Sequence, residues 1–212
     1  MSGLTLTGDR RDDLRVVLPA GTDPPAAVPP QMFAAAAQAY ASGRRLDMQS
    51  LARRLGIGRA TLYRRAGNRE DLLDEVIWWR ARRTVAVQLL MAGGLSGTSR
   101  IAAVVSGVLH AAEADRALRA FIESDPDAAL RILTGYRSVT AAGLTAALER
   151  LIDLERSRGC FEAELDTSTL AYAIKRISEG FLYADALAGR APDSGRAVTV
   201  IRALLTGLDR TT

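Results

Sequence analysis

The apolar residues of this chain recur at helical spacing through most of its length. Apolar residues spaced i, i+3, i+4 and i+7 share one face of a helix, and this spacing occurs at Met48, Leu51, Ala52 and Leu55. No segment alternates between apolar and polar residues for long enough to predict a β-strand. The pattern therefore predicts an all-α protein of about nine helices.

Capping and turn residues place the ends of the first helices. Pro30 fits the first turn of one helix, and Asp47 is a good N-cap for the next. Gly56 supplies a turn before a third helix, and Asn68 caps a fourth that runs to about residue 92. Further helices are expected over residues 97–114, 116–123, 126–134, 136–158, 167–188 and 194–208.

The first 29 residues differ from the rest, because they combine four prolines with scattered charges and show no helical spacing. We expect residues 1–29 to form a flexible N-terminal arm. Arg10, Arg11 and Arg15 leave two interpretations open. Either they contact a DNA minor groove, or neighbouring aspartates cancel their charge and the arm is a disordered leader.

Positive charge is concentrated in one part of the chain. Residues 44–83 hold eleven arginines against five acidic residues, a net charge of +6, whereas the whole chain carries +4. A concentrated basic segment is typical of a surface that binds a polyanion. The alternative is an ordinary solvated helical surface. The residues around these arginines indicate which of the two interpretations applies.

The helix that follows Gly56 separates an inner from an outer face. Leu62 packs inward together with Ile57 of the turn, and Arg65 is expected to lean toward the interior. The outward face carries hydrogen-bond donors near its N-terminal end, as a recognition helix needs in order to read the DNA major groove. This outward face consists of Arg59, Ala60, Tyr63 and Arg64.

This arrangement favours a helix-turn-helix over a generic helical hairpin. Arg59 and Arg64 suit guanine bases, and Ala60 leaves room for a thymine methyl group. The hydroxyl groups of Thr61 and Tyr63 suit phosphate oxygens. Further candidate contacts on the preceding helix are Gln49, Arg53 and Arg54.

Residues 52–73 hold the pattern Ala-x-x-Leu-Gly-Ile-x-Arg-Ala-Thr-Leu-Tyr-x-x-Ala-x-Asn-Arg-Glu-Asp-Leu-Leu. This pattern closely resembles the signature of the TetR/AcrR family of bacterial transcriptional regulators. The shared features are the Thr-Leu-Tyr triplet and a basic residue, here Arg69, that opens the fourth helix before a Glu-x-Leu. The resemblance covers about residues 30–80.

The resemblance implies a function and a division of the chain. It implies a homodimer that binds a pseudo-palindromic DNA operator, most simply a repressor released by a small-molecule effector, and it gives Tyr63 and Arg69 the role of holding phosphates. It also implies a helix-turn-helix domain over residues 30–75 and an effector-binding and dimerisation domain over residues 76–212.

Two positions depart from the family pattern. Ala66 stands where the family usually has phenylalanine, and Arg65 stands where histidine is common. Trp78 or Trp79 would fill the volume lost at Ala66. With these departures the chain resembles a smaller subgroup, the QsdR-like regulators linked to control of lactone-degrading genes, and a lactone or another amphipathic molecule would then be the effector.

The last two helices carry wide apolar faces. In TetR-like proteins such helices pair across a two-fold axis, so the resemblance implies a dimer interface here; the alternative is an internal core. Gly180 weakens the first of the two helices, and a close helix–helix crossing would explain it. The expected interface residues are Leu170, Ile174, Ile177, Phe181, Ala197, Ile201, Leu204 and Leu208.

Polar residues on the central helices are candidates for lining an effector pocket. His110 is otherwise a buried histidine with satisfied hydrogen bonds, and Lys175 with Glu179 is otherwise a surface ion pair. The two tryptophans are expected in the core. The candidate pocket residues are His110, Tyr136, Arg137, Lys175, Glu179 and Tyr183.

Other function classes lack support in the sequence. One histidine and one cysteine leave little material for a zinc site or a Cys–His pair, and nucleotide-binding and hydrolase motifs are absent, so we expect no catalysis, metal or cofactor. Without an apolar run of membrane length or a secretory leader, a cytoplasmic protein is expected. The remaining alternatives are an activator or ligand-independent regulator of the same fold, or a helical protein-interaction module.

Overall fold

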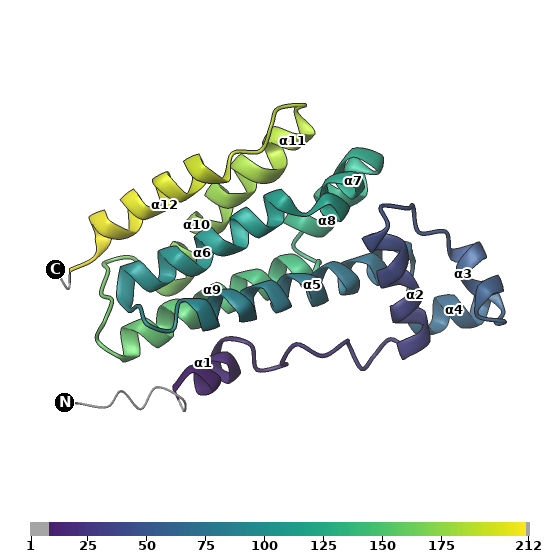
Figure 1. The fold of residues 1–212 in the computed structure, drawn as a ribbon, viewed down its shortest axis with the longest axis horizontal. Helices are drawn as coiled ribbons and strands as arrows, with labels where there is room; N and C mark the ends of the chain where they lie inside the picture. Colours follow the sequence, from purple (N-terminus) through teal and green to yellow (C-terminus); the bar gives the residue numbers. More distant parts are fainter. Residues whose placement is uncertain (1–8, 211–212) are drawn as a thin grey trace.

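The computed structural model describes residues 9–210, which are helical nearly throughout and confirm the all-α prediction (Figure 1). None of the helices in this range is long and apolar enough to cross a membrane. The helices are α1 (Asp9–Val17), α2 (Pro30–Ala41), α3 (Met48–Arg54), α4 (Arg59–Ala66), α5 (Arg69–Met91), α6 (Gly97–Ala114), α7 (Arg116–Ser124), α8 (Pro126–Thr134), α9 (Val139–Ser157), α10 (Thr167–Glu179), the π-helical turn η1 (Gly180–Ala184), α11 (Asp185–Leu187) and α12 (Ser194–Leu208).

Local capping interactions set the predicted helix starts. The Asp47 carboxylate accepts hydrogen bonds from the backbone N–H groups of Gln49 and Ser50, at 3.1 and 3.0 Å. Asn68 and Asp71 form a capping box, in which each side chain accepts from the other residue's backbone N–H, at 3.0 and 2.8 Å. Such caps contribute about 1 kcal/mol each, so these helix ends follow from neighbouring residues alone.

The long helices α5, α6, α9, α10 and α12 run side by side and form the body of the molecule, with α2, α3 and α4 at one end (Figure 1). Two clusters of buried apolar residues hold this arrangement. One cluster joins α2, α3 and α4 to the first part of α5 and to α7 and α8, and the other fills the body. The helix α5 belongs to both clusters and is therefore a continuous link between the two ends.

The expectation of a flexible arm is wrong for the part of residues 1–29 that the structure describes. Residues 9–17 form α1, which packs on α5 and α9 at the end of the body opposite α3 and α4 (Figure 1). Val17 and Leu18 are buried there, and Val28 is buried in the other cluster. The positions of Arg11 and Arg15 on α1 do not support an arm that contacts DNA beside α4.

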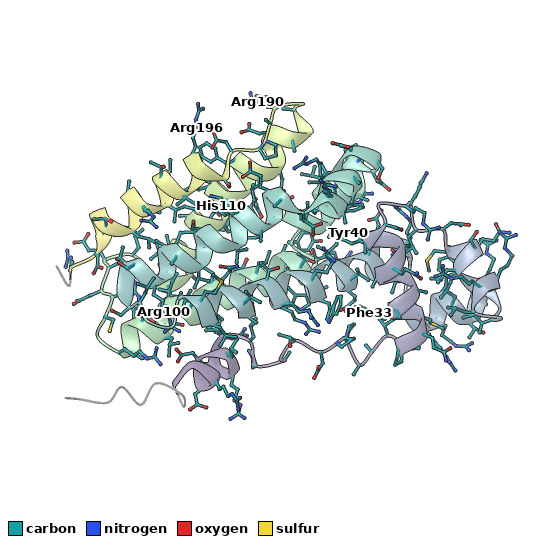
Figure 2. All side chains as sticks on the ribbon, in the orientation of Figure 1. Phe33, Tyr40, Arg100, His110, Arg190 and Arg196 are labelled. Atoms are coloured by element: carbon teal, nitrogen blue, oxygen red, sulfur yellow. The ribbon has the colours of Figure 1, made fainter. Side chains whose placement is uncertain are left out.

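A buried ion pair explains why α1 is held in place. Asp13 is 3% exposed, and its carboxylate accepts a hydrogen bond from Arg100, at 2.6 Å, and others from Arg158. Arg100, labelled in Figure 2, also donates to Glu155, at 2.9 Å. These arginines follow Asp13 by 87 and 145 residues, so the partners of Asp13 are not the arginines close to it in the sequence.

Gly180 does not lie at a crossing between helices of the described chain. A side-chain carbon added there would meet no atom within 4 Å. The glycine instead opens the π-helical turn that connects α10 to α11. The predicted single helix over 167–188 is therefore locally widened, and the explanation by close packing is wrong within one chain.

Candidate DNA interface and ligand cavity

The turn between α3 and α4 has the geometry that the sequence predicted. Gly56 adopts a φ of 64°, in the left-handed region that glycine enters at little cost. The next residue, Ile57, donates its N–H to the carbonyl of Ala52 at 3.1 Å. Leu62 of α4 is fully buried against this corner, so α3 and α4 are held at a defined angle.

The outer surface of α4 is basic and open. Arg59, Ala60 and Arg64 are exposed, Tyr63 is 41% exposed, and Thr61 is half-buried. Within residues 9–210, no acidic side chain forms an ion pair with Arg59 or Arg64. These guanidinium groups are therefore available to a ligand outside the protein.

Arg65 was expected to lean inward, and the structure places it on the surface. The backbone position is close to the inner face, but Ala66 takes up the buried space beside it. A long arginine side chain reaches solvent from such a position at little cost. The exposed basic surface of α4 is therefore larger than predicted.

The helix α3 contributes exposed polar residues beside this surface. Gln49, Arg53 and Arg54 are all exposed. Arg53 donates to the hydroxyl of Ser50 at 3.1 Å, and Arg54 donates to the carbonyl of Ala35 in α2 at 3.3 Å. Both arginines are thus oriented by weak contacts that a stronger acceptor could replace.

Arg69 does not offer a free guanidinium, which differs from the expectation that it holds a phosphate. It forms an ion pair with Asp125 at 2.6 Å and donates to the carbonyl of Leu46 at 3.0 Å, with only 20% of its side chain exposed. Partial burial tends to raise the pKa of Asp125, but the hydrogen bond from Arg69 lowers the pKa below its usual value. Arg69 therefore joins the loop before α3 to the junction of α7 and α8.

Two further contacts tie the start of α5 to the following helices. Arg131 of α8 forms two hydrogen bonds with the Glu70 carboxylate, at 2.9 and 2.7 Å. The buried Asp74 accepts hydrogen bonds at the start of α9 from the Ser138 hydroxyl and the Thr140 N–H, each at 3.0 Å. Sequence reasoning missed these contacts, because their members lie more than 60 residues apart.

An apolar cavity of about 110 Å³ lies in the body of the molecule, between α5, α6, α9 and α10. Its walls include Lys175, Glu179 and Tyr183, so half of the predicted pocket residues line it. Lys175 and Glu179 form an ion pair at 3.2 Å and are only 15% and 9% exposed. Burial, and to a lesser degree the Glu179 carboxylate, raises the pKa of Tyr183 to about 12, which keeps its hydroxyl protonated.

The other half of the predicted pocket residues lie elsewhere. Tyr136 is 91% exposed in the turn between α8 and α9, and Arg137 stacks over its ring at 5.9 Å. His110 is exposed on α6, where its Nδ1 lies 2.7 Å from the carbonyl oxygen of Ser106 (Figure 2). Both interpretations of His110, as a pocket residue and as a buried histidine, are therefore wrong.

A second cavity of about 390 Å³ adjoins the apolar one on the side of α2. Five residues line both cavities, among them Leu144 and Tyr183. The walls of the second cavity also carry Tyr40, Trp79 and Arg80. None of these three was predicted as a pocket residue; for Tyr40 and Trp79 the reason is that aromatic residues at helical spacing more often form core.

The tryptophans were expected in the core, and the two occupy different places. Trp78 packs on α9, where a side-chain carbon added at Gly143 would lie 2.6 Å from its ring. Trp79 makes an edge-to-face contact with Phe33, with ring centroids 5.5 Å apart, in the apolar cluster that includes Ala66.

Half of the predicted dimer-interface residues are buried within the single chain. Leu170, Ile174, Ala197 and Ile201 are each at most 1% exposed, because α10 packs on α9 and α12 packs on α6. They are core residues and cannot reach a second subunit. The half-buried members of the predicted set are Ile177, Phe181, Leu204 and Leu208.

Comparison with known proteins agrees with this geometry. Residues 34–76 match the family model described as bacterial regulatory proteins of the tetR family, and residues 96–206 match the tetracyclin repressor-like C-terminal domain. The solved structure of the transcriptional repressor QsdR from R. erythropolis, a TetR-family protein, is 30% identical with a TM-score of 0.75. The match covers 84% of this chain and 94% of that one. No significant match was found among curated proteins.

Proposed function

Because the chain belongs to the TetR family of bacterial transcriptional regulators, we propose that it is a homodimeric repressor that a small effector releases from its operator. The observation that carries the proposal is the exposed surface of α4, whose arginines have no acidic partner among the described residues. A polyanion is the natural partner of such a surface. An operator with two similar half-sites would match a dimer.

In this proposal α4 enters the major groove. Arg59 and Arg64 donate to guanine O6 and N7, and Ala60 allows the helix to approach the bases closely. Tyr63 and Thr61 bind phosphates and set the position of the helix along the duplex. Gln49, Arg53 and Arg54 extend the contact onto the backbone beside α3.

Arg69 has a positioning role in this proposal rather than the phosphate contact that the family resemblance implied. Its hydrogen bond to Leu46 orients the loop that leads into α3, and its ion pair to Asp125 ties that loop to α7 and α8. A shift of α7 or α8 would therefore move the loop before α3. This contact offers a route from an effector cavity to the DNA-binding surface.

The dimer of this proposal uses the outer surfaces of α10 and α12. Tyr172 and Val200 are large apolar residues, 59% and 43% exposed on these helices. Gly180, at the start of η1 directly after α10, and Gly207 of α12 are exposed and have open space around them, which would let a second subunit approach closely. The half-buried Ile177, Phe181, Leu204 and Leu208 widen the apolar area.

The salt dependence of DNA binding tests the proposal. Binding to DNA from upstream of the protein's own gene should weaken steeply between 50 and 200 mM salt, because each neutralised phosphate releases counterions; six phosphate contacts predict a loss of about a thousand-fold. Fluorescence anisotropy with labelled DNA measures this slope. Binding that does not depend on salt, or no binding to any upstream fragment, would overturn the DNA-binding role.

A further inference from the structure

Two residues that line the second cavity have a buried hydrogen-bond donor without a partner among the described residues. The indole Nε1 of Trp79 and the Nε of Arg80 are buried, and neither has a hydrogen-bond partner among the described residues. Both residues line this cavity. A buried donor without an acceptor costs about 1–3 kcal/mol, and a ligand acceptor that came within hydrogen-bond distance of either atom would recover this free energy.

The same walls have an excess of positive charge. Arg80 and Arg83 line the cavity with a single acid, Asp115, which pairs with Arg80 at 2.8 Å. The guanidinium of Arg83 stacks on the Trp79 ring at 4.9 Å and has no acidic partner within residues 9–210. The cavity therefore favours an acceptor that is also an anion.

The neighbouring apolar cavity requires a different chemistry. Its walls are mostly valine and leucine side chains of α6 and α9, and only Lys175, Ser178, Glu179 and Tyr183 bring polar atoms to it. The Lys175 ammonium is already paired with the Glu179 carboxylate, which also pairs with Arg176. The two cavities adjoin through shared walls, which are Val108, Ala112, Leu133, Leu144 and Tyr183.

We infer that the two cavities form one site for an anionic amphiphile, a molecule with a carboxylate-like head and an apolar tail. The head lies at Trp79, Arg80 and Arg83, and the tail lies in the apolar cavity behind Leu144. This inference rests on the proposed release of the protein by an effector, and it names the effector's chemical class.

The head site also explains how occupancy reaches the DNA-binding end. Tyr40 of α2 lines the cavity, and Arg80 lies 5.5 Å from the centre of its ring. Asp115, the partner of Arg80, caps α7 by accepting from the N–H of Ala117 at 2.9 Å. A bound carboxylate competes with Asp115 for Arg80 and so acts on α7, whose far end leads to the Asp125 that holds Arg69.

The test compares decanoate with decanol, two amphiphiles of equal chain length and different head charge. Isothermal titration calorimetry on the full chain, below the critical micelle concentration of decanoate and the solubility limit of decanol, should show decanoate binding about ten-fold or more tightly than decanol. Arg83→Gln, an exposed change that leaves the fold intact, should remove most of this difference. Trp79→Phe keeps an aromatic ring that packs on Phe33 but removes the indole N–H, so it should weaken the binding of decanoate.

Arg15→Gln on α1, whose side chain is 83% exposed and lines neither cavity, is the matched control and should bind decanoate like the unmodified protein. Equal affinities for the two amphiphiles, no binding of either, or an Arg83→Gln protein with unchanged preference would overturn the inference. Operator binding is measured on the same proteins without ligand. If the ligand results overturn the inference but the proteins still bind the operator, the DNA-binding proposal is unaffected. If the unmodified protein does not bind the operator, the DNA-binding proposal is overturned instead.

Discussion

Single residues on α4 divide into those that would read bases and those that would position the helix. Arg59 and Arg64 extend from the exposed face with no acidic partner among the described residues, and their fork of donors fits guanine. Tyr63 lies beside them with its ring partly covered, and a hydroxyl suits a phosphate, which all sequences share. The exposure of Arg65 adds a third basic group to this face.

Replacing these residues should therefore have two different effects. Arg59→Ala or Arg64→Ala should cost about 1–3 kcal/mol on the operator and little on unrelated DNA, whereas Tyr63→Phe should weaken both about equally. Fluorescence anisotropy on an operator and on a shuffled duplex measures the two losses. Arg15→Ala on α1, at the end of the body opposite α4, is the control, and a Tyr63→Phe protein that loses only operator binding would contradict these roles.

At the scale of elements, acidic residues distant in sequence hold helices together. Asp13 is the clearest case, because its buried carboxylate holds α1 on the body through Arg100 and Arg158. Burial tends to raise the pKa of Asp13, but hydrogen bonds and charge from the two arginines lower it below its usual value. The hydrogen bond from Arg69 lowers the pKa of Asp125 in the same way.

Asp13→Asn should destabilise the fold strongly, because it removes one of the two carboxylates that compensate the buried Arg100. A loss of about 3–5 kcal/mol in the free energy of unfolding is expected. Its matched control is Asp12→Asn, since Asp12 is 70% exposed in a loose pair with Arg15 and should change stability by less than about 0.5 kcal/mol. Urea unfolding measures both, and equal losses would mean that α1 is not held by Asp13.

Asp125→Asn isolates the ion pair with Arg69, because asparagine still caps α8. The pKa of Asp125 is lowered in the folded protein, so the pair stabilises fully above about pH 4 and loses this contribution as the pH falls through the folded pKa. Urea unfolding should show the variant about 1–2 kcal/mol less stable at pH 7 and nearly equal to the unmodified protein at the lowest pH that preserves the fold. The same deficit at both pH values would contradict a role for the charge.

At the scale of the whole molecule, the outer surfaces of α10 and α12 leave apolar side chains in solvent. The most exposed of them are Tyr172 and Val200, which the second subunit of the proposed dimer would cover. Two copies so joined would present two α4 helices to one face of a duplex. The quaternary structure and operator affinity should then depend on the same residues.

Tyr172→Glu should therefore convert the dimer to a monomer and weaken operator binding at least ten-fold, because only one half-site remains bound. Sedimentation velocity at micromolar concentration measures the first effect, and anisotropy the second. Val87→Glu on α5 is the control, since Val87 is 51% exposed away from α10 and α12. An unmodified protein that sediments as a monomer would rule out the dimer.

Features that depend on neighbouring residues can be predicted from the amino-acid sequence alone. Asp47 and Asn68 cap helices through N–H groups two or three residues away, and the spacing of Leu62 against Arg59 and Arg64 sets the two faces of α4. Gly56 marks the turn, because few other residues adopt its φ. The all-α fold, the helix-turn-helix and its exposed basic face were therefore predictable.

Which distant residues become partners depends on how the helices pack in three dimensions. Asp13 pairs with arginines far along the chain, and Arg69 pairs with Asp125 instead of facing solvent. The most apolar faces of α10 and α12 pack against the core of the same chain. Hydrophobic spacing shows that a face is buried but carries no information about which surface buries it, and an ion pair leaves no periodic trace in the sequence. The two cavities and the ion pair that joins Asp125 to Arg69 likewise could not be predicted, because they arise where several helices meet.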